Sequence, residues 1–220
     1  MNCKLSRVFL LSPANCNGRR AAQVLSPNAQ SDIAVRLRSP EGAPIGDVFS
    51  FVSGLYFRGK LTYARAFASP PEIDQPIVGS GVLVITPNAG LRSPDTRLSA
   101  AAITAFARGD VHAGNASYRT PLEQSAGALR AAIGDCPVVL LGSIASPKYV
   151  DILLGIFGRQ LHFPAAFVGR GDMSRGGLLL RHAASGEELE YIPVEGAVLH
   201  GARPPKLPPL RRLSGAGTRN

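Results

Sequence analysis

The stretch Pro137-Val-Val-Leu-Leu-Gly-Ser-Ile-Ala-Ser-Pro-Lys-Tyr149 decides the predicted fold. Its apolar run, Val138–Leu141, is typical of a buried strand, and the small residues that follow are typical of a turn into a helix. In open α/β sheets, ligands bind beyond the carboxyl ends of the strands. The stretch therefore predicts a buried strand with a candidate site at its end, where Ser143, Lys148 and Tyr149 are the available side chains.

Further strands alternate with helices along the chain, which predicts an α/β fold. Buried strands are expected at 7–11 and 81–86, with a short one at 160–163. Helices are expected at 19–25, 45–52, 54–68, 99–107, 121–133 and up to Phe157. The alternation of Ile33, Val35 and Leu37 permits either a strand or a short helix. We predict a single domain, residues 1–200, with a mixed, largely parallel central sheet flanked by helices.

The C-terminal part predicts two additions to this domain. Leu178–Val194 resembles two strands around the Ser185-Gly186 turn, which predicts a C-terminal β hairpin. Residues 201–220 form a basic, Pro-rich tail that we expect to be disordered at its end. This tail carries five basic residues and no acidic one, which leaves +4 of the net charge of +9 on the rest of the chain.

The charge and the scattered thiols limit the classes of function. A sequence pI of about 10.1 favours anionic partners, and nucleic acid is the partner that we predict. Cys3, Cys16 and Cys136 lack the spacing of a metal site or a disulfide framework, and the four His are scattered, so no metal or cofactor is expected. The apolar run before Ser12 is too short for a signal sequence or a membrane span, which predicts a cytoplasmic protein without a membrane partner. The oligomeric state is left open.

Three segments supply candidate anion-binding side chains. The loop after the first strand offers Asn15, Asn17 and Arg19, although a plain strand-to-helix turn explains it equally well. Residues 87–95 are expected to form a long Gly/Pro loop ending at Asp95. The Gly-rich segment 167–177 offers several more, or is simply a flexible turn. Its candidates are Arg170, Asp172, Ser174 and Arg175.

The helix at 54–68 has an apolar face and a basic stripe. Arg58 and Arg65 share the stripe, and with Lys60 they could present a basic wall to a phosphate backbone, or be a solvated face. We expect the loops at 12–20, 87–95, 143–149 and 169–175 to converge on one cleft. Its floor would be the 137–149 stretch, and its walls would include Asn15, Arg19, Asp95, Arg170 and Arg175.

Five short motifs, in this order, resemble the peroxide-stress protein family of the YaaA type and related uncharacterised phage and bacterial α/β domains. They are Leu11-Ser-Pro-Ala-Asn15, Ser53-Gly-Leu-Tyr56 with Arg58, Gly90-Leu-Arg-Ser-Pro-Asp95, Ile144-Ala-Ser-Pro-Lys-Tyr149 and Arg170-Gly-Asp-Met-Ser-Arg175. The resemblance implies a mixed α/β protein with a positively charged cleft, DNA binding and a stress-related role. Two departures from the family are visible. Asn15 stands where the family has Lys, and Gly176-Gly177 makes the helix that follows the last motif in the family doubtful here.

Three functions remain as alternatives. The first is a DNA- or RNA-binding protein without catalysis. The second is an enzyme acting on a nucleotide or nucleobase, such as a glycosylase-like hydrolase. A fainter similarity to the uracil-DNA glycosylase superfamily, through Leu140-Leu-Gly-Ser143, favours it, with Asn15, Asn17 or Asp95 near a water. The third is an interaction domain that presents 204–209 as a polyproline ligand.

Overall fold

A six-stranded mixed sheet forms the centre of the computed structural model, which describes residues 6–71, 74–145, 147–198, 201–205 and 207. The strand order is β4-β3-β1-β6-β7-β8, with an antiparallel strand at each edge and four parallel strands between. The predicted α/β class with a mostly parallel sheet is confirmed. The strands are β1 (Val8–Leu11), β3 (Val82–Thr86), β4 (Gly90–Arg92), β6 (Val138–Leu141), β7 (Leu161–Pro164) and β8 (Tyr191–Pro193).

The central strands are buried along their whole length. Every residue of β1, β3 and β6 is buried, and Leu11 of β1 pairs with Val84 of β3 on one side and Leu141 of β6 on the other. Parallel strands covered on both faces favour continuous apolar runs rather than alternation. This requirement explains why these three strands were visible in the sequence.

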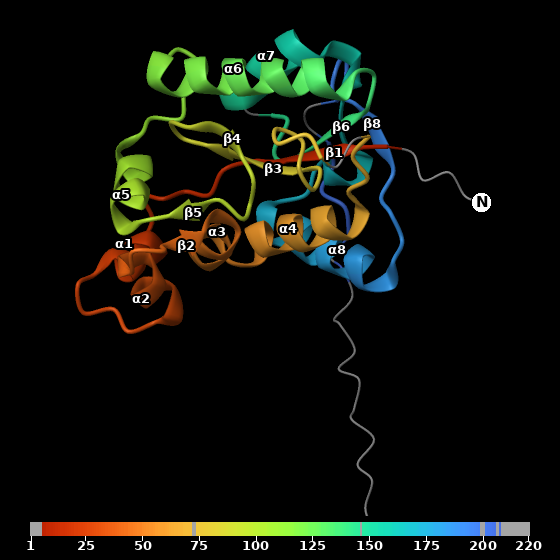
Figure 1. The fold of residues 1–220 in the computed structure, drawn as a ribbon. Helices are drawn as coiled ribbons and strands as arrows, with labels where there is room; N and C mark the ends of the chain where they lie inside the picture. Colours follow the sequence, from red (N-terminus) through yellow and green to blue (C-terminus); the bar gives the residue numbers. More distant parts are fainter. Residues whose placement is uncertain (1–5, 72–73, 146, 199–200, 206, 208–220) are drawn as a thin grey trace, which may run out of the picture.

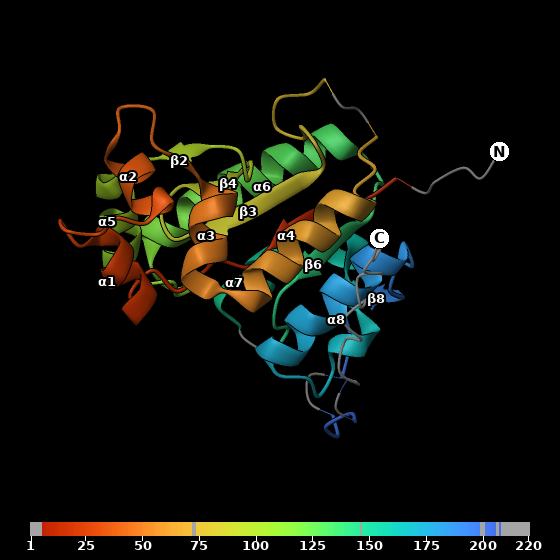
Figure 2. The same ribbon diagram turned by 90° about the horizontal axis from the view of Figure 1, so that it is seen from below.

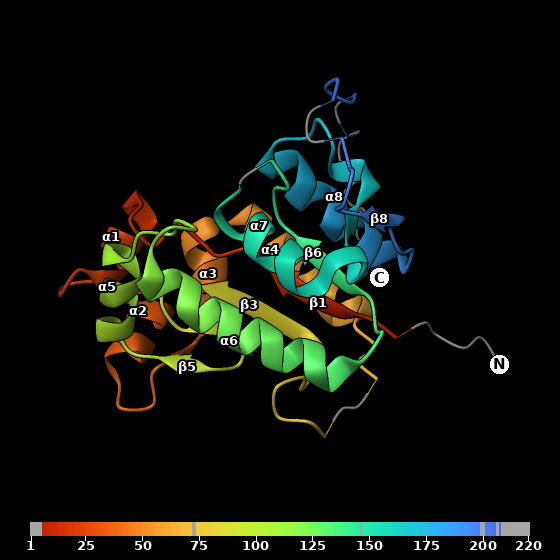
Figure 3. The ribbon, with the colours of Figure 1, turned by 90° about the horizontal axis from the view of Figure 1, so that it is seen from above.

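Helices cover both faces of the sheet (Figure 1). One face carries α4 (Leu55–Phe67) and α8 (Asp172–Ser185), which lie in front of the strands when the molecule is seen from below (Figure 2). The other carries α6 (Ala116–Ile133) and α7 (Pro147–Phe157), which lie in front when it is seen from above (Figure 3). Helix α4 precedes β3, one neighbour of β1, and α6 precedes β6, its other neighbour. The connections to the two neighbours of β1 therefore lie on opposite faces of the sheet.

Smaller elements gather beyond the carboxyl ends of the parallel strands (Figure 1). The predicted helices at 19–25, 45–52 and 99–107 are confirmed within one or two residues, and the ambiguous 31–38 segment is a helix capped by the Ser31 hydroxyl. These elements are α1 (Arg19–Leu25), α2 (Asp32–Arg38), β2 (Ala43–Pro44), α3 (Ile45–Ser53), β5 (Arg97–Leu98) and α5 (Ala100–Arg108).

Helices α4 and α8 cross at two glycines. A Cβ at Gly59 would lie 2.6 Å from the Gly176 carbonyl oxygen, and a Cβ at Gly176 would lie 2.8 Å from the Leu55 carbonyl oxygen. Only glycine permits so close a backbone approach. Gly176 thus lies where two helices cross, and the helix that Gly176-Gly177 made doubtful after Arg175 is present as α8.

The predicted hairpin at 178–194 was wrong in its first arm. Residues up to Ser185 continue α8, whose end is marked by Gly186 in the left-handed conformation at φ +70°. The second arm is a strand, β8, but its antiparallel partner is β7. The sequence misled because the apolar run 178–180 fits a buried helix as well as a strand.

Two other boundaries differ from the prediction. The segment 87–95 is not one long loop, because Gly90–Arg92 returns as β4 along β3. Helix α6 begins at Ala116 rather than at Pro121, because the Asn115 side chain accepts a hydrogen bond from the Ser117 amide and caps it there. Within the described residues, single 3-10 turns lie at Gly158–Gln160 and Ala165–Phe167, on either side of β7.

The first part of the predicted tail lies against the domain. The Ala202 carbonyl oxygen would be 2.2 Å from a Cβ at Gly169, and Leu207 lies beside Gly177 of α8. The expected disorder at the end of the tail, and most of its basic residues, fall outside the described residues. None of the helices in the described ranges has the length and apolar character needed to cross a membrane.

Candidate functional site

A cavity of about 560 Å³ lies beyond the carboxyl ends of the central strands. We call it the β1/β6 cavity, because the turns that follow β1 and β6 contribute to its wall and the chain switches faces between these two strands. Ligands of open α/β sheets bind at such a switch point. Its polar lining side chains include Ser12, Asn15, Asn17, Tyr56, Ser143, Lys148, Tyr149 and Asp172.

Lys60 lies directly beneath Ser12. Its side chain is 1% exposed, and Nζ lies 2.6 Å from the Ser12 carbonyl oxygen and 2.8 Å from Ser12 Oγ. No ion pair within the described part of the chain includes it. Burial lowers the pKa of Lys60 to about 7, and the Asp172 carboxylate opposes this shift. A buried lysine without a carboxylate is costly, so it calls for an explanation.

Two aromatic rings hold the ammonium form of Lys60. Nζ lies 4.6 Å from the ring centroid of Tyr56 and 4.8 Å from that of Phe57. Such cation–π contacts favour the charged form where water is excluded. Burial therefore favours the neutral form of this amine, whereas the aromatic rings favour its charged form.

Tyr149 fixes the turn after β6. Its hydroxyl lies 3.0 Å from the Ser143 amide nitrogen and 3.0 Å from the Ser143 carbonyl oxygen. A Cβ at Gly142 would lie 2.9 Å from Tyr149 Oη and 3.2 Å from Ser12 Oγ, so the two oxygens flank Gly142. Burial raises the pKa of Tyr149, which keeps this phenol neutral.

The Tyr56 hydroxyl is a buried polar group at the cavity wall, and no described residue forms a hydrogen bond of good geometry with it, although the Arg175 guanidinium lies close by. Burial raises the pKa of Tyr56 well above its usual range, although the nearby Arg175 guanidinium lowers it. Leaving such a hydroxyl unpaired costs on the order of 1–3 kcal/mol. A ligand in the cavity would supply the missing partner.

Six of the predicted site residues line the β1/β6 cavity: Asn15, Asn17, Ser143, Lys148, Tyr149 and Asp172. Asn15 is oriented by its own turn, where its Oδ1 accepts a hydrogen bond from the Asn17 amide at 2.9 Å. Asp172 lies in the first turn of α8, where the helix dipole favours a carboxylate. Loops 12–20 and 143–149 and the start of α8 therefore do converge.

Three other predicted residues lie outside this cavity. Arg19 is exposed at the start of α1, and Arg58 is exposed on α4. Asp95 pairs with Arg65 at 2.7 Å, on the exposed side of the molecule. The expected convergence of the 87–95 segment was wrong, because β4 turns this segment back along β3 and away from the site.

Arg175 is turned into the protein rather than toward a cleft. Its guanidinium donates to the Phe167 carbonyl oxygen at 3.1 Å and lies 5.3 Å from the Phe167 ring centroid. Nη1 is 3.6 Å from Asp172 Oδ1. Arg175 therefore ties the first turn of α8 to the preceding 3-10 turn.

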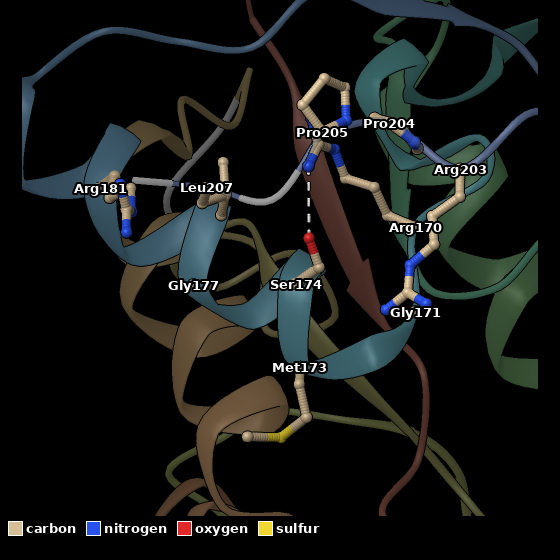
Figure 4. A pocket seen from close by; sticks show the side chains of 10 residues that line it. All are labelled: Arg170, Gly171, Met173, Ser174, Gly177, Arg181, Arg203, Pro204, Pro205 and Leu207. Atoms are coloured by element: carbon tan, nitrogen blue, oxygen red, sulfur yellow. Dashed lines mark hydrogen bonds between the residues drawn. The ribbon is translucent and has the colours of Figure 1, made fainter. Parts of the chain in front are cut away.

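Arg170 and Ser174 line a second cavity, of about 290 Å³, on the outer side of α8. We call it the α8/tail cavity, because Arg203, Pro204 and Pro205 close it (Figure 4). Arg170 donates to Ser174 Oγ at 3.2 Å, while the Arg203 side chain lies on the Gly171 side of the pocket. The single predicted cleft is thus two separate cavities.

Sequence reasoning missed Ser12 and Tyr56, which line the β1/β6 cavity, and Lys60, which lies beneath Ser12. Lys60 was assigned to the exposed basic stripe, which was wrong. A signal was available, since Lys60 lies three residues after Phe57 and four before Ala64 and so falls on the buried face of α4. No pattern in the sequence predicted that the Tyr56 hydroxyl would be buried at the cavity wall.

Comparisons with protein-family models, curated proteins and solved structures found no match to this chain. The resemblance to the peroxide-stress family therefore stays a prediction. Within the described ranges, no three His, Cys, Asp or Glu side chains group closely enough to hold a metal ion.

Proposed function

We propose that the protein is an enzyme that binds a nucleobase or nucleotide in the β1/β6 cavity and acts on it. The observation that carries the proposal is a cavity at the switch point of the sheet, with the buried Tyr56 hydroxyl in its wall lacking a hydrogen bond of good geometry to any described residue. The volume of about 560 Å³ falls in the range of small-molecule sites, about 300–1,000 Å³. The alternative of a single basic cleft for a nucleic-acid backbone has less support here, because the arginines lie outside this cavity.

The lining suits a ligand with a polar ring and an anionic end. Tyr56 and Ser143 offer hydroxyls, and Asn15 and Asn17 offer amides, which are the groups that read the edge of a base. Lys148 is the exposed cation of the lining and would contact a phosphate.

Calorimetric titration with nucleobases, nucleosides and nucleotides tests this proposal. Tyr56→Phe should weaken binding about tenfold, since it removes a hydrogen bond of about 1.4 kcal/mol that only the bound state makes. It should leave the free protein as stable as before. Tyr118→Phe is the matched control, because the Tyr118 hydroxyl is also buried and unpaired among the described residues but lies outside the cavity lining.

A second substitution measures the contribution of the phosphate to binding separately from that of the base. Lys148→Ala should weaken the binding of nucleotides and leave that of nucleosides unchanged. Absence of binding by every base, nucleoside and nucleotide at millimolar concentration would contradict the proposed function.

Nucleic-acid binding is the second candidate, and the α8/tail cavity favours it. Arg170 and Arg203 share this cavity, beside a tail whose charge is entirely positive. Basic side chains of this kind would add salt-dependent affinity for phosphates. In a salt titration with single-stranded and duplex DNA, Arg203→Ala should reduce the slope of log K against log salt by about 1.

Arg159→Ala is the charge-matched control for that titration. Arg159 is exposed and precedes the amino end of β7, whereas Arg203 lines the α8/tail cavity. Equal effects of the two substitutions, or no binding at low salt, would contradict a nucleic-acid interface at the α8/tail cavity.

A further inference from the structure

We propose that Ser12 and Lys60 form a nucleophile–base pair, in which Ser12 Oγ attacks the carbonyl carbon of an ester or amide bound in the β1/β6 cavity. The inference rests on the proposed function for the place where the substrate binds, and adds to it the reacting atoms and the class of reaction, acyl transfer to serine followed by hydrolysis.

The positions of the two side chains suit these roles. Ser12 lines the cavity, whereas Lys60 is buried beneath Ser12. Ser12 is therefore the group that can contact a substrate. The separation of 2.8 Å between Nζ and Oγ is within the reach that proton transfer requires. Both side chains are held by rigid elements, since Ser12 directly follows β1 and Lys60 lies in the middle of α4.

The two contacts of Lys60 orient its lone pair. The Ser12 carbonyl oxygen accepts only, so the contact at 2.6 Å uses an N–H of Lys60. A neutral amine that donates there keeps a lone pair for the hydrogen of Ser12 Oγ–H. Ser12 thus orients the Lys60 amine with its carbonyl oxygen and donates the proton from its hydroxyl.

Both protonation states of Lys60 are accessible near neutral pH. Burial lowers its pKa to about 7, so a large fraction of the amine is neutral and can act as a base. The rings of Tyr56 and Phe57 then stabilise the ammonium that forms after proton transfer. A purely structural lysine would need only the ammonium form.

The reaction balances as hydrolysis. The Ser12 Oγ–carbon bond forms as Nζ takes the hydroxyl proton, and the bond from the carbonyl carbon to the leaving oxygen or nitrogen breaks as Lys60 returns that proton to the leaving group. Water then attacks the acyl-serine, giving one proton to Nζ, and the Oγ–carbon bond breaks. Ser12 regains its proton from Lys60, and the acid and the alcohol or amine are released.

Labelling of the full chain with an alkyl fluorophosphonate tests the pair. The Ser12 Oγ–phosphorus bond would form and fluoride would leave, which mass spectrometry detects as an adduct on the peptide that contains Ser12. We expect labelling to accelerate between pH 6 and pH 8 and to be absent in Ser12→Ala. It should slow at least tenfold in Lys60→Met and Lys60→Gln, neither of which can take a proton.

The controls separate chemistry from folding. Ser117→Ala removes an exposed serine of α6, outside the cavity lining, and should label at the wild-type rate. Circular dichroism and the thermal unfolding midpoint of each variant confirm that the fold persists. A lack of any Ser12 adduct on the folded wild type, or wild-type labelling in both folded Lys60 variants, would overturn the pair.

Labelling and ligand titration of the same samples test the Ser12–Lys60 pair and the proposed function separately. Nucleotide binding without labelling would overturn the pair and leave the ligand class standing. Labelling without any binding of bases, nucleosides or nucleotides would support the pair and contradict the ligand class.

Discussion

The two ends of strand β1 hold polar networks that differ in their charge balance. At its amino end, Arg7 pairs with Glu188, which also accepts a hydrogen bond from the Tyr191 hydroxyl at 2.8 Å. Tyr191 Oη is 2.6 Å from Tyr63 Oη, and Tyr63 accepts from the Leu189 amide. At the carboxyl end, Lys60 contacts Ser12 alone among hydrogen-bonding groups of the described chain, without a carboxylate partner.

Both networks are built from helix α4, through Tyr63 at one end and Lys60 at the other. The amino-end network is closed, because an acid balances its base and each hydroxyl has a partner. The carboxyl-end network is open, because within the described residues Lys60 forms no ion pair and the Tyr56 hydroxyl beside it forms no hydrogen bond of good geometry. Polar groups that stabilise a fold are normally satisfied, so the difference favours the carboxyl end as the candidate site.

Glu188→Ala should have the largest effect on stability, a loss of about 3 kcal/mol. It leaves the Arg7 cation with an incomplete set of partners and the Tyr191 hydroxyl without its acceptor. Urea unfolding measures the change. Glu187→Ala, which removes an exposed neighbouring carboxylate, should cost less than about 0.5 kcal/mol. Similar losses in the two variants would show that the closed network adds no stability.

Gly176→Ala should cost about 2 kcal/mol, because the added methyl group meets the backbone of Leu55 and Tyr56 at 2.8 Å. The added methyl group would push α8 away from α4, and α4 contributes to the polar networks at both ends of β1. Gly177→Ala is the matched control, since its methyl group would meet only Leu207, at an ordinary 3.6 Å, and alanine favours a helix. Urea unfolding of both variants would show whether the close crossing is the cause.

Tyr149→Phe should cost about 1 kcal/mol, because the Ser143 amide and carbonyl lose their common partner. Tyr118→Phe should cost nothing in the same unfolding experiment, since its hydroxyl is unpaired among the described residues. If the two variants were equally stable, the Tyr149 hydroxyl would not fix the turn after β6.

Lys60→Met should have the smallest effect at pH 7, within about 1 kcal/mol in either direction, because an apolar side chain of similar length removes a desolvated amine. Its effect should change with pH. The pKa of Lys60 is lowered from 10.5 to about 7 in the folded state, so above pH 7 the unfolded state binds more protons.

The wild type should therefore gain stability relative to Lys60→Met between pH 7 and pH 9, by on the order of 1 kcal/mol per pH unit. The difference between the two proteins cancels the titration of the other groups. Free energies of unfolding at pH 7, 8 and 9 measure it. A constant difference would mean that the pKa of Lys60 is not lowered.

The sequence predicted the parts of the fold that depend on local pattern. The run Val138–Leu141 indicated a buried strand, and the cap at Ser99 and the periodicity of 54–68 identified two helices. The failures at 178–185 and 90–92 arose where two structures fit one local pattern. At 178–185 the segment packs as a helix against α4, which lies more than 100 residues earlier in the chain, and at 90–92 the chain pairs with β3, the strand directly before it.

The candidate site was predicted in place but not in its chemistry. Side chains that follow strands, such as Ser143 and Asn15, were found because topology alone brings them together. Lys60 was missed because burial of a cation contradicts the usual pattern of exposed charge, and only the position of Ser12, 48 residues earlier, explains it.

The two margins of the sheet also affect how the molecule behaves at high concentration. Each outermost strand is only three residues long, and one of them, β8, ends with Pro193, which has no N–H to offer. Short margins with a proline give a neighbouring molecule little backbone to pair with. Such margins disfavour edge-to-edge association of the apolar central strands with those of another molecule.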